Sequence, residues 1–114
     1  MEEYKMVTAK KLGQATLNTS VTTLVTGVTG GVTEVTSIWL VNTGSSTRTV
    51  KIYSHGSSSA TENMLFQWTL DPNGGSMLLQ LNNTPIILAE GETLRLVQDE
   101  GSDVTASCYG IEEV

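Results

Sequence analysis

The sequence predicts an all-β fold: an antiparallel two-sheet β-sandwich of about eight strands with jelly-roll or Greek-key-like connections. Three observations support this prediction. Runs rich in Val, Thr, Ile and Leu recur along the 114 residues, and many alternate apolar with polar side chains, as half-buried strands do. Short loops rich in Gly, Asn and Ser separate these runs. No segment shows the helical period over a useful length.

The length predicts one β-sandwich domain, residues 13–114, preceded by an N-terminal arm or edge segment, residues 1–12. A chain of 114 residues buries roughly two-thirds of its unfolded surface, which is enough for a core without disulfides or metal ions. The first residues, MEEYKMVTAKK, mix charges with few apolar side chains. We expect them to form a loosely held edge, or to become ordered only against a partner.

The first half of the domain predicts one or two strands in residues 13–26 and a flexible connection at 27–31, GVTGG. Residues 37–54, SIWLVNTGSSTRTVKIYS, then predict an antiparallel hairpin with its turn at NTGSST. The first of its strands is apolar on both faces, so we expect it to be central in a sheet. The second is expected to be half-buried, with Val50 and Ile52 inward and Thr49, Lys51 and Tyr53 in water.

The second half of the domain contains the clearest strand pattern, MLFQWTL at residues 64–70. We expect one of its faces to enter the core, with Trp68 as a core residue. A compact turn follows at 71–75, DPNGG, in which glycines take left-handed conformations. Further strands are expected from residue 76, after Pro85 at a sheet edge, after a turn at Glu90 and Gly91, and over the last residues. Their inward side chains are Met77, Leu79, Leu81, Leu94 and Leu96.

The charge balance excludes some partner classes. The formal net charge is −6 with 6 basic residues, so we expect no nucleic-acid binding through a basic face. No apolar stretch approaches the ~20 residues of a membrane-spanning helix, and the first residues lack an apolar signal core, so we expect no membrane partner. The single cysteine, Cys108, cannot form an internal disulfide, and it alternates with Val104 and Ala106 as a small core residue would.

The residue types that most often serve as nucleophiles, general bases or metal ligands, above all His and Cys, are rare in this sequence. We therefore expect neither an enzyme nor a bound cofactor. His55 is the only histidine, and no nucleophile-elbow motif accompanies it. Cysteine and histidine together number two, too few for a closed zinc site. The carboxylates of Asp99, Glu100 and Asp103 lie in one turn and could approach a calcium ion, but their spacing is not that of a calcium-binding loop, and a solvated turn is favoured.

The aromatic and exposed apolar residues carry the remaining binding signal. An interface anchor or a sugar-stacking platform could be formed by the flat rings of Trp39, Tyr53, Phe66 and Trp68, although most of them, Trp68 included, are expected in the core. Leu65 and Leu78 face away from the expected core, so each needs a second covering surface, for which another subunit is a candidate. The predicted interface residues are Leu65, Leu78, Trp39, Tyr53 and His55.

Four stretches, spread between residues 12 and 114 and making up about half of the chain, resemble a diffuse group of small phage virion structural proteins. They are LGQATLNTSVTTLVT, LVNTGSSTRTVKIYSHG, LAEGETLRLVQ and VTASCYGIEEV. The sequence departs from this group at residues 27–31, where a turn containing proline is more usual, which affects the loop geometry. The resemblance implies a β-sandwich component such as a head decoration protein or a small neck, tail or fibre module. It also implies symmetric self-association, often threefold, and no active site.

The residues and the resemblance together favour a phage virion structural protein, a capsid decoration or head–tail accessory protein acting by self-association and lattice binding. Its partners are then copies of itself, with a trimer favoured, and phage capsid or tail proteins. It is expected in the virion after synthesis in the host cytoplasm. The alternative is a carbohydrate- or receptor-binding β-sandwich module of a tail appendage. An exposed Trp or Tyr beside Asn and Asp favours this alternative, whereas an ordered N-terminal arm and a large apolar contact between protomers favour the first function.

Overall fold

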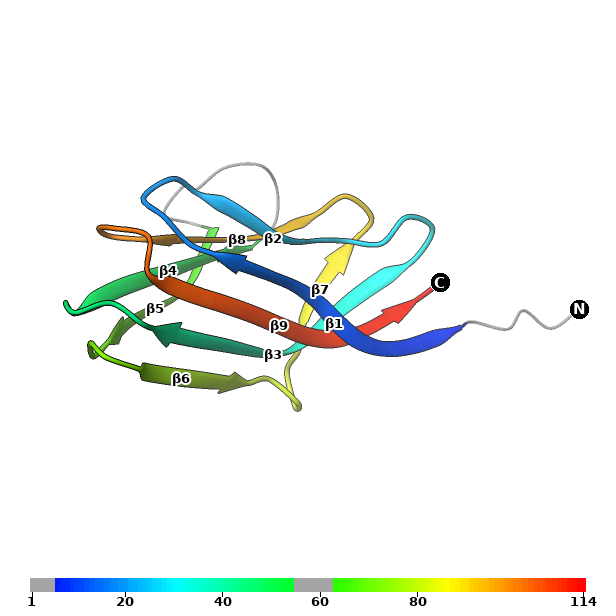
Figure 1. Cartoon of the computed structure of the whole chain (residues 1–114). Helices are drawn as coiled ribbons and strands as arrows, with labels where there is room; N and C mark the ends of the chain where they lie inside the picture. Colours follow the sequence, from blue (N-terminus) through cyan, green and yellow to red (C-terminus); the bar gives the residue numbers. More distant parts are fainter. Residues whose placement is uncertain (1–5, 55–62) are drawn as a thin grey trace, which may run out of the picture.

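The computed structural model describes residues 6–54 and 63–114, which form two β-sheets packed face to face (Figure 1). One sheet has five strands in the order β1-β9-β3-β6, with β7 also paired to β3, and the other has four in the order β2-β8-β4-β5. The predicted all-β sandwich is confirmed. The strands in the described residues are β1 (Val7–Thr16), β2 (Thr22–Thr26), β3 (Val32–Asn42), β4 (Arg48–Ser54), β5 (Met64–Leu70), β6 (Gly75–Gln80), β7 (Ile86–Ala89), β8 (Thr93–Gln98) and β9 (Val104–Glu113).

The strands are connected as a jelly roll. β6 and β7 pair with successive parts of β3, residues 37–42 and 32–35, and therefore act as one interrupted strand. The antiparallel pairs are then nested along the chain: β1 with β9, β2 with β8, β3 with β6 and β7, and β4 with β5. A long hairpin of this kind, wrapped into two sheets, has the jelly-roll topology. Of the two connection patterns that the sequence predicts, the structure adopts this one.

The predicted hairpin over residues 37–54 is wrong. β3 and β4 belong to different sheets: β3 lies between β9 and the β6–β7 pair, and β4 lies between β8 and β5. The connection crosses the sandwich because the buried side chain of Asn42 binds the backbone there. Its Nδ2 donates to the carbonyl oxygens of Ser46 at 2.8 Å and Asp71 at 3.1 Å, and its Oδ1 accepts from the amide of Gly44 at 3.0 Å. The central position of the first strand is confirmed.

The core lies between the two sheets and contains the inward side chains expected for β4, β6 and β8. Met77, Leu81, Leu94 and Leu96 are buried, and Leu79 packs against the cluster from its edge. Cys108 in β9 is fully buried, as predicted for a small core residue. The largest fully buried side chains are Leu17, Ile38, Leu40, Ile52, Leu70, Leu88, Leu94, Leu96 and Gln98.

Two aromatic residues differ from expectation. Tyr53 lies on the outer face of the four-stranded sheet but is only 8% exposed, so the expectation that it faces water is wrong. It occupies a central strand, with Arg95 and Met64 as its cross-strand neighbours. Trp68 pairs with Val50 and so has the predicted inward orientation, but it is 42% exposed, and the prediction of a core residue is wrong. The reason is that β5 is an edge strand. It has a neighbouring strand, β4, on one side only, so part of an inward side chain on β5 stays exposed at the edge.

The predicted N-terminal segment, residues 1–12, is partly a sheet edge. Residues 7–12 belong to β1, which pairs with β9, and residues 1–5 lie outside the described residues. Met6 continues the pairing, because its amide and carbonyl both bind Val114 at 3.0 Å. The boundary proposed after residue 12 falls inside β1, at a register shift between Lys11 and Gly13.

The turn from β5 to β6 crosses between the sheets at the same end as the β3–β4 connection. Asn73 and Gly74 take left-handed backbone conformations there, with φ of 60° and 96°. Glycine was expected in such positions, but one of the two is taken by asparagine, which tolerates this region. The amides of Asn73 and Gly74 donate to the carbonyl oxygens of Gly44 and Asn42, at 2.8 Å and 2.7 Å. The two crossings therefore stabilise each other.

We predict that Asn42→Ala lowers the free energy of unfolding by about 2–4 kcal/mol, because it leaves several buried backbone groups at the crossing without their partner. Urea denaturation followed by circular dichroism measures the change. The matched control is Asn82→Ala, at an exposed asparagine, for which a change within about 0.5 kcal/mol is expected. Equal stabilities of the Asn42→Ala variant and the wild type would contradict this role.

Candidate functional site

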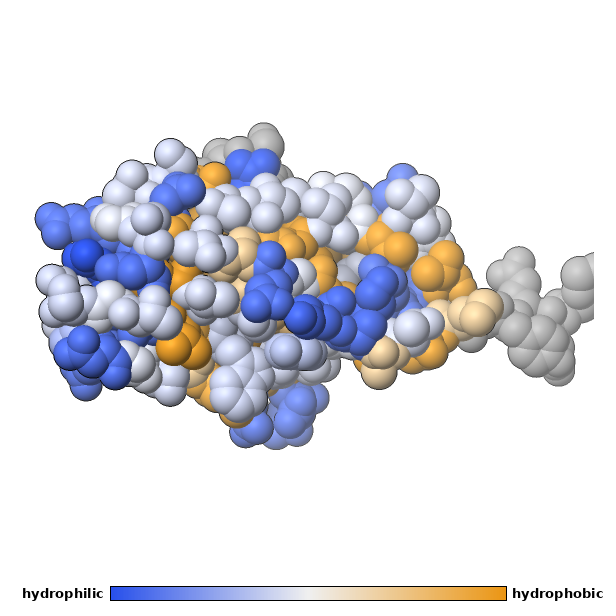
Figure 2. All heavy atoms as spheres, viewed as in Figure 1, coloured by the Kyte–Doolittle hydropathy of each residue, from blue (hydrophilic) through white to orange (hydrophobic). Residues whose placement is uncertain are grey.

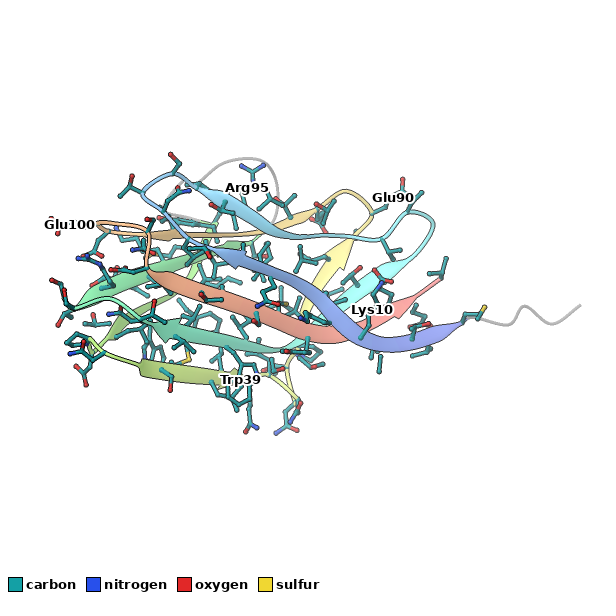
Figure 3. All side chains as sticks on the ribbon, viewed as in Figure 1. Lys10, Trp39, Glu90, Arg95 and Glu100 are labelled. Carbon is teal, nitrogen blue, oxygen red and sulfur yellow. The ribbon has the colours of Figure 1, made fainter. Side chains whose placement is uncertain are left out.

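The outer face of the five-stranded sheet carries an exposed cluster of apolar side chains. Trp39 in β3 and Leu78 in β6 are direct cross-strand partners and are 46% and 38% exposed. Tyr109 in β9 pairs with Ser37 and so lies diagonal to Trp39. In Figure 3, Trp39 points away from the four-stranded sheet, and Arg95 points to the opposite side of the sandwich. We call this surface the Trp39 face; its large apolar members are Val7, Val32, Trp39, Val41, Leu78, Ile87, Tyr109 and Ile111.

The Trp39 face has few charged residues. The strand registers place Lys11, Glu34 and Glu113 on it, near its apolar members. Apolar exposure continues at the end of the molecule where the termini lie, which Figure 2 shows in orange; Met6 and Val114 there are 72% and 53% exposed. An antiparallel sheet that faces water normally presents polar side chains, so the exposed apolar residues on this face make it a candidate contact surface.

The edge strand β5 exposes a second group of apolar residues. Leu65 and Trp68 are each 42% exposed, and Phe66 is half-buried against the core. A register shift at Leu65 forms a bulge at the start of the strand, and the pairing of β5 with β4 is regular from Phe66 to Leu70. The bulge brings Leu65 next to an open groove.

The groove lies between the start of β5 and the connection from β6 to β7. It has a volume of about 580 Å³ and a mainly apolar lining. Its polar members include Ser54, whose side-chain oxygen is buried and has no hydrogen-bond partner among the described residues. The lining residues are Ser54, Leu65, Phe66, Leu81, Thr84, Pro85, Ile86, Ile87 and Glu92.

A smaller hollow of about 250 Å³ lies on the outer face of the four-stranded sheet. Thr49, Lys51, Tyr53 and Asp99 line it, with aliphatic residues beside them. Tyr53 as a whole is only 8% exposed. It therefore presents little flat surface on which a sugar could stack.

A polar cluster occupies the end of the sandwich that contains Glu100 in Figure 3. Arg48 Nε donates to both carboxylate oxygens of Asp103, at 3.0 and 3.2 Å, and Gln98 Nε2 donates to Asp103 Oδ1 at 2.8 Å. The hydrogen bond from Arg48, followed by that from Gln98, lowers the pKa of Asp103 below its ordinary value. Gln98 Oε1 in turn accepts from the Val104 amide at 3.0 Å. The cluster therefore joins β4, β8 and β9.

The carboxylates considered for calcium have other partners. Asp103 binds Arg48 and Gln98, Asp99 Oδ1 accepts from the Thr49 amide at 2.9 Å, and Glu100 lies 3.6 Å from Arg48. In the part of the chain that the structure describes, no group of three or more Cys, His, Asp or Glu side chains could hold a metal ion. Burial raises the pKa of the Cys108 thiol to about 12, so the thiol stays protonated and unreactive near neutral pH.

The predicted interface residues fall in separate places. Trp39 and Leu78 lie together on the Trp39 face, Leu65 lies at the groove, and Tyr53 is buried on the other sheet. His55 lies outside the described residues. The sequence analysis missed Ile87 and Tyr109, although each stands next to a core residue in an alternating strand, and this position would have indicated an outward side chain.

Comparisons with known proteins give no relative for this chain. No family model, curated protein or solved structure matches it. The described residues contain no helix that is long and apolar enough to span a membrane.

We predict that acid destabilises the fold partly through Asp103. The pKa of Asp103 is lowered in the folded state. Its contribution to the free energy of unfolding is therefore complete above the ordinary pKa of 3.8, and is lost as the pH falls through the lower pKa of the folded state. Melting temperatures measured from pH 7 to pH 2 should therefore fall less steeply below about pH 4 for Asp103→Asn than for the wild type.

The control for this experiment is Asp71→Asn, at an exposed carboxylate in the turn between β5 and β6. Its acid profile is expected to follow the wild type. An Asp103→Asn profile parallel to the wild type across the whole range would contradict the prediction.

Proposed function

We propose that this protein is a phage virion structural protein of the capsid decoration or head–tail accessory type, which self-associates, binds a repeated protein lattice and has no catalytic role. The observation that carries the proposal is the exposed apolar Trp39 face. Trp39 and Leu78 are adjacent on it, and Tyr109 is diagonal to Trp39. Tryptophan and tyrosine are enriched at the centres of protein interfaces, where they contribute most to the binding free energy.

The low charge of the Trp39 face supports a protein partner. Burying a charged side chain without a partner is costly, and Lys11, Glu34 and Glu113 are the charged residues that the registers place there. Polar residues that could form hydrogen bonds across a contact lie between the apolar ones, including Ser37, Ser107 and Gln80. A surface of this composition suits a contact that is repeated in many copies of a lattice.

The fold is compatible with a virion role without establishing it. Jelly rolls occur in viral capsid proteins and in lectins, so the architecture fits both this proposal and its alternative. The virion assignment rests on the resemblance of the four sequence stretches. The same resemblance favours a trimer, and closed symmetry is the usual outcome when one chain associates with itself. Capsid or tail proteins are the proposed partners, after synthesis in the host cytoplasm.

A carbohydrate- or receptor-binding role is the second candidate. It is supported by the hollow beside Tyr53, where Lys51, Thr49 and Asp99 offer polar groups. The low exposure of Tyr53 weighs against stacking with a sugar. Trp39 is well exposed, but its cross-strand neighbours are Leu78 and Ser107, with neither Asn nor Asp directly opposite it. The exposed aromatic surface therefore fits a protein contact better.

We predict that the chain is a stoichiometric component of phage particles. The test is quantitative mass spectrometry of particles purified on a density gradient from a lysate of the phage or prophage-carrying strain that encodes this sequence. Peptides of the chain should co-migrate with the major capsid protein in a fixed, multi-copy ratio. Peptides confined to the soluble fraction at the top of the gradient would contradict the virion assignment.

A further inference from the structure

We propose that two copies of this chain pair through β5, antiparallel about a twofold axis, with Trp68 of each copy entering the groove of the other. This contact is separate from the Trp39 face. It specifies one partner, a second copy, within the self-association proposed above and rests on that proposal. It is based on three observations: an unprotected strand edge, an exposed inward-facing tryptophan, and an apolar groove beside them.

The free edge of β5 lacks most of the features that normally prevent strand addition. β5 is the last strand of its sheet, and its sequence MLFQWTL contains neither charged residues nor proline. The other edges differ. The edge strand β1 carries two lysines, Lys10 and Lys11. The edge strand β2 is covered by β1, because the carbonyl of Leu24 in β2 lies close to Gly13 in β1. The edge formed by β6 and β7 is interrupted by residues 81–85. Proteins commonly protect their edges with lysines, proline, breaks or a covering segment, so among the described residues β5 is the edge open to another strand.

Trp68 is oriented for a contact that the described residues of its own chain do not complete. Its pairing with Val50 directs it to the inner side of the sandwich, yet it is 42% exposed. A strand added to the free edge of β5 would extend that sheet and cover the exposed part of the ring. Burying a tryptophan at the centre of a contact is among the largest single contributions to association.

The groove has the chemistry to receive an indole ring. Its lining is mainly apolar, and its volume of about 580 Å³ leaves room for a large side chain. The buried oxygen of Ser54 has no hydrogen-bond partner among the described residues, although buried hydroxyls are normally satisfied. An occupant that is apolar apart from one hydrogen-bonding group would match this lining. Indole, with its single N–H donor, has this character.

The sequence of β5 is self-complementary in an antiparallel pair centred on Gln67. Gln67 of one copy then faces Gln67 of the other on the outer side. On the inner side Phe66, which lines the groove, lies opposite Trp68 of the second copy. Because the axis is twofold, both grooves receive an indole in the same way. The absence of charge on β5 means that no like charges meet.

The test is oxidative cross-linking of Gln67→Cys. The pairing places the two introduced thiols directly across the twofold axis, about 5 Å apart at Cβ, close enough for a disulfide after small adjustment. Thr69→Cys is the matched control, since it lies on the same exposed face of the same strand. Its two thiols would be four residues apart along the strands, roughly 13 Å, and beyond bonding reach. The native thiol of Cys108 is fully buried and contributes no background.

Rapid formation of a covalent dimer by Gln67→Cys, at least tenfold faster than by Thr69→Cys, is the expected result. Adding Trp68→Ala to Gln67→Cys should slow the reaction by a similar factor, and circular dichroism checks that each variant is folded. No cross-link with Gln67→Cys, or equal rates for the two cysteine variants, would overturn the β5 contact. Either negative result would leave the proposed function standing if the chain is still found in purified particles.

Discussion

The crossing from β3 to β4 determines the rest of the architecture, and the side chain of Asn42 holds it. Asn42 is fully buried and binds backbone groups of the segments that follow β3 and β5. This arrangement sends β4 into the opposite sheet, so that β3 can pair with β9 and with β6 and β7. Gln98, which is 1% exposed, also holds a connection at this end, through hydrogen bonds with Asp103 and Val104. Two buried amides thus fix the loops at one end of the sandwich.

The crossing also explains why the apolar surfaces lie where they do. With β3 at the centre of the five-stranded sheet, Trp39 is placed in the middle of an outer face rather than at its margin. With β4 and β5 in the other sheet, β5 becomes an edge whose inward tryptophan is only partly covered. One surface is a sheet face and the other a strand edge, so the two proposed contacts would not compete for the same residues. A subunit with two independent contacts can both close a ring and join that ring to others.

Side-chain alternation allowed much of this fold to be predicted, because burial on one side imposes a period of two. Val50, Ile52, Leu94 and Leu96 were placed inward on that basis and are buried. Alternation gives the face of the sheet to which a side chain points. It does not show whether other residues cover that side chain, because this depends on strand order. For this reason Trp68 was expected in the core although it lies at an edge. The segment after Asn42 predicts a hairpin turn because hairpin turns and crossings between sheets use the same residue types, Asn, Gly and Ser.

We propose that the chain associates with itself through exposed apolar surfaces, above all the Trp39 face. Light scattering during size-exclusion chromatography, over a dilution series, measures this association. We expect a mass that is a multiple of 12.2 kDa and persists on dilution. The dissociation constant should be at least about tenfold larger for Trp39→Ser and unchanged for Val21→Ser, at an exposed apolar residue beside the four-stranded sheet. A mass of 12.2 kDa at every concentration would contradict this proposal.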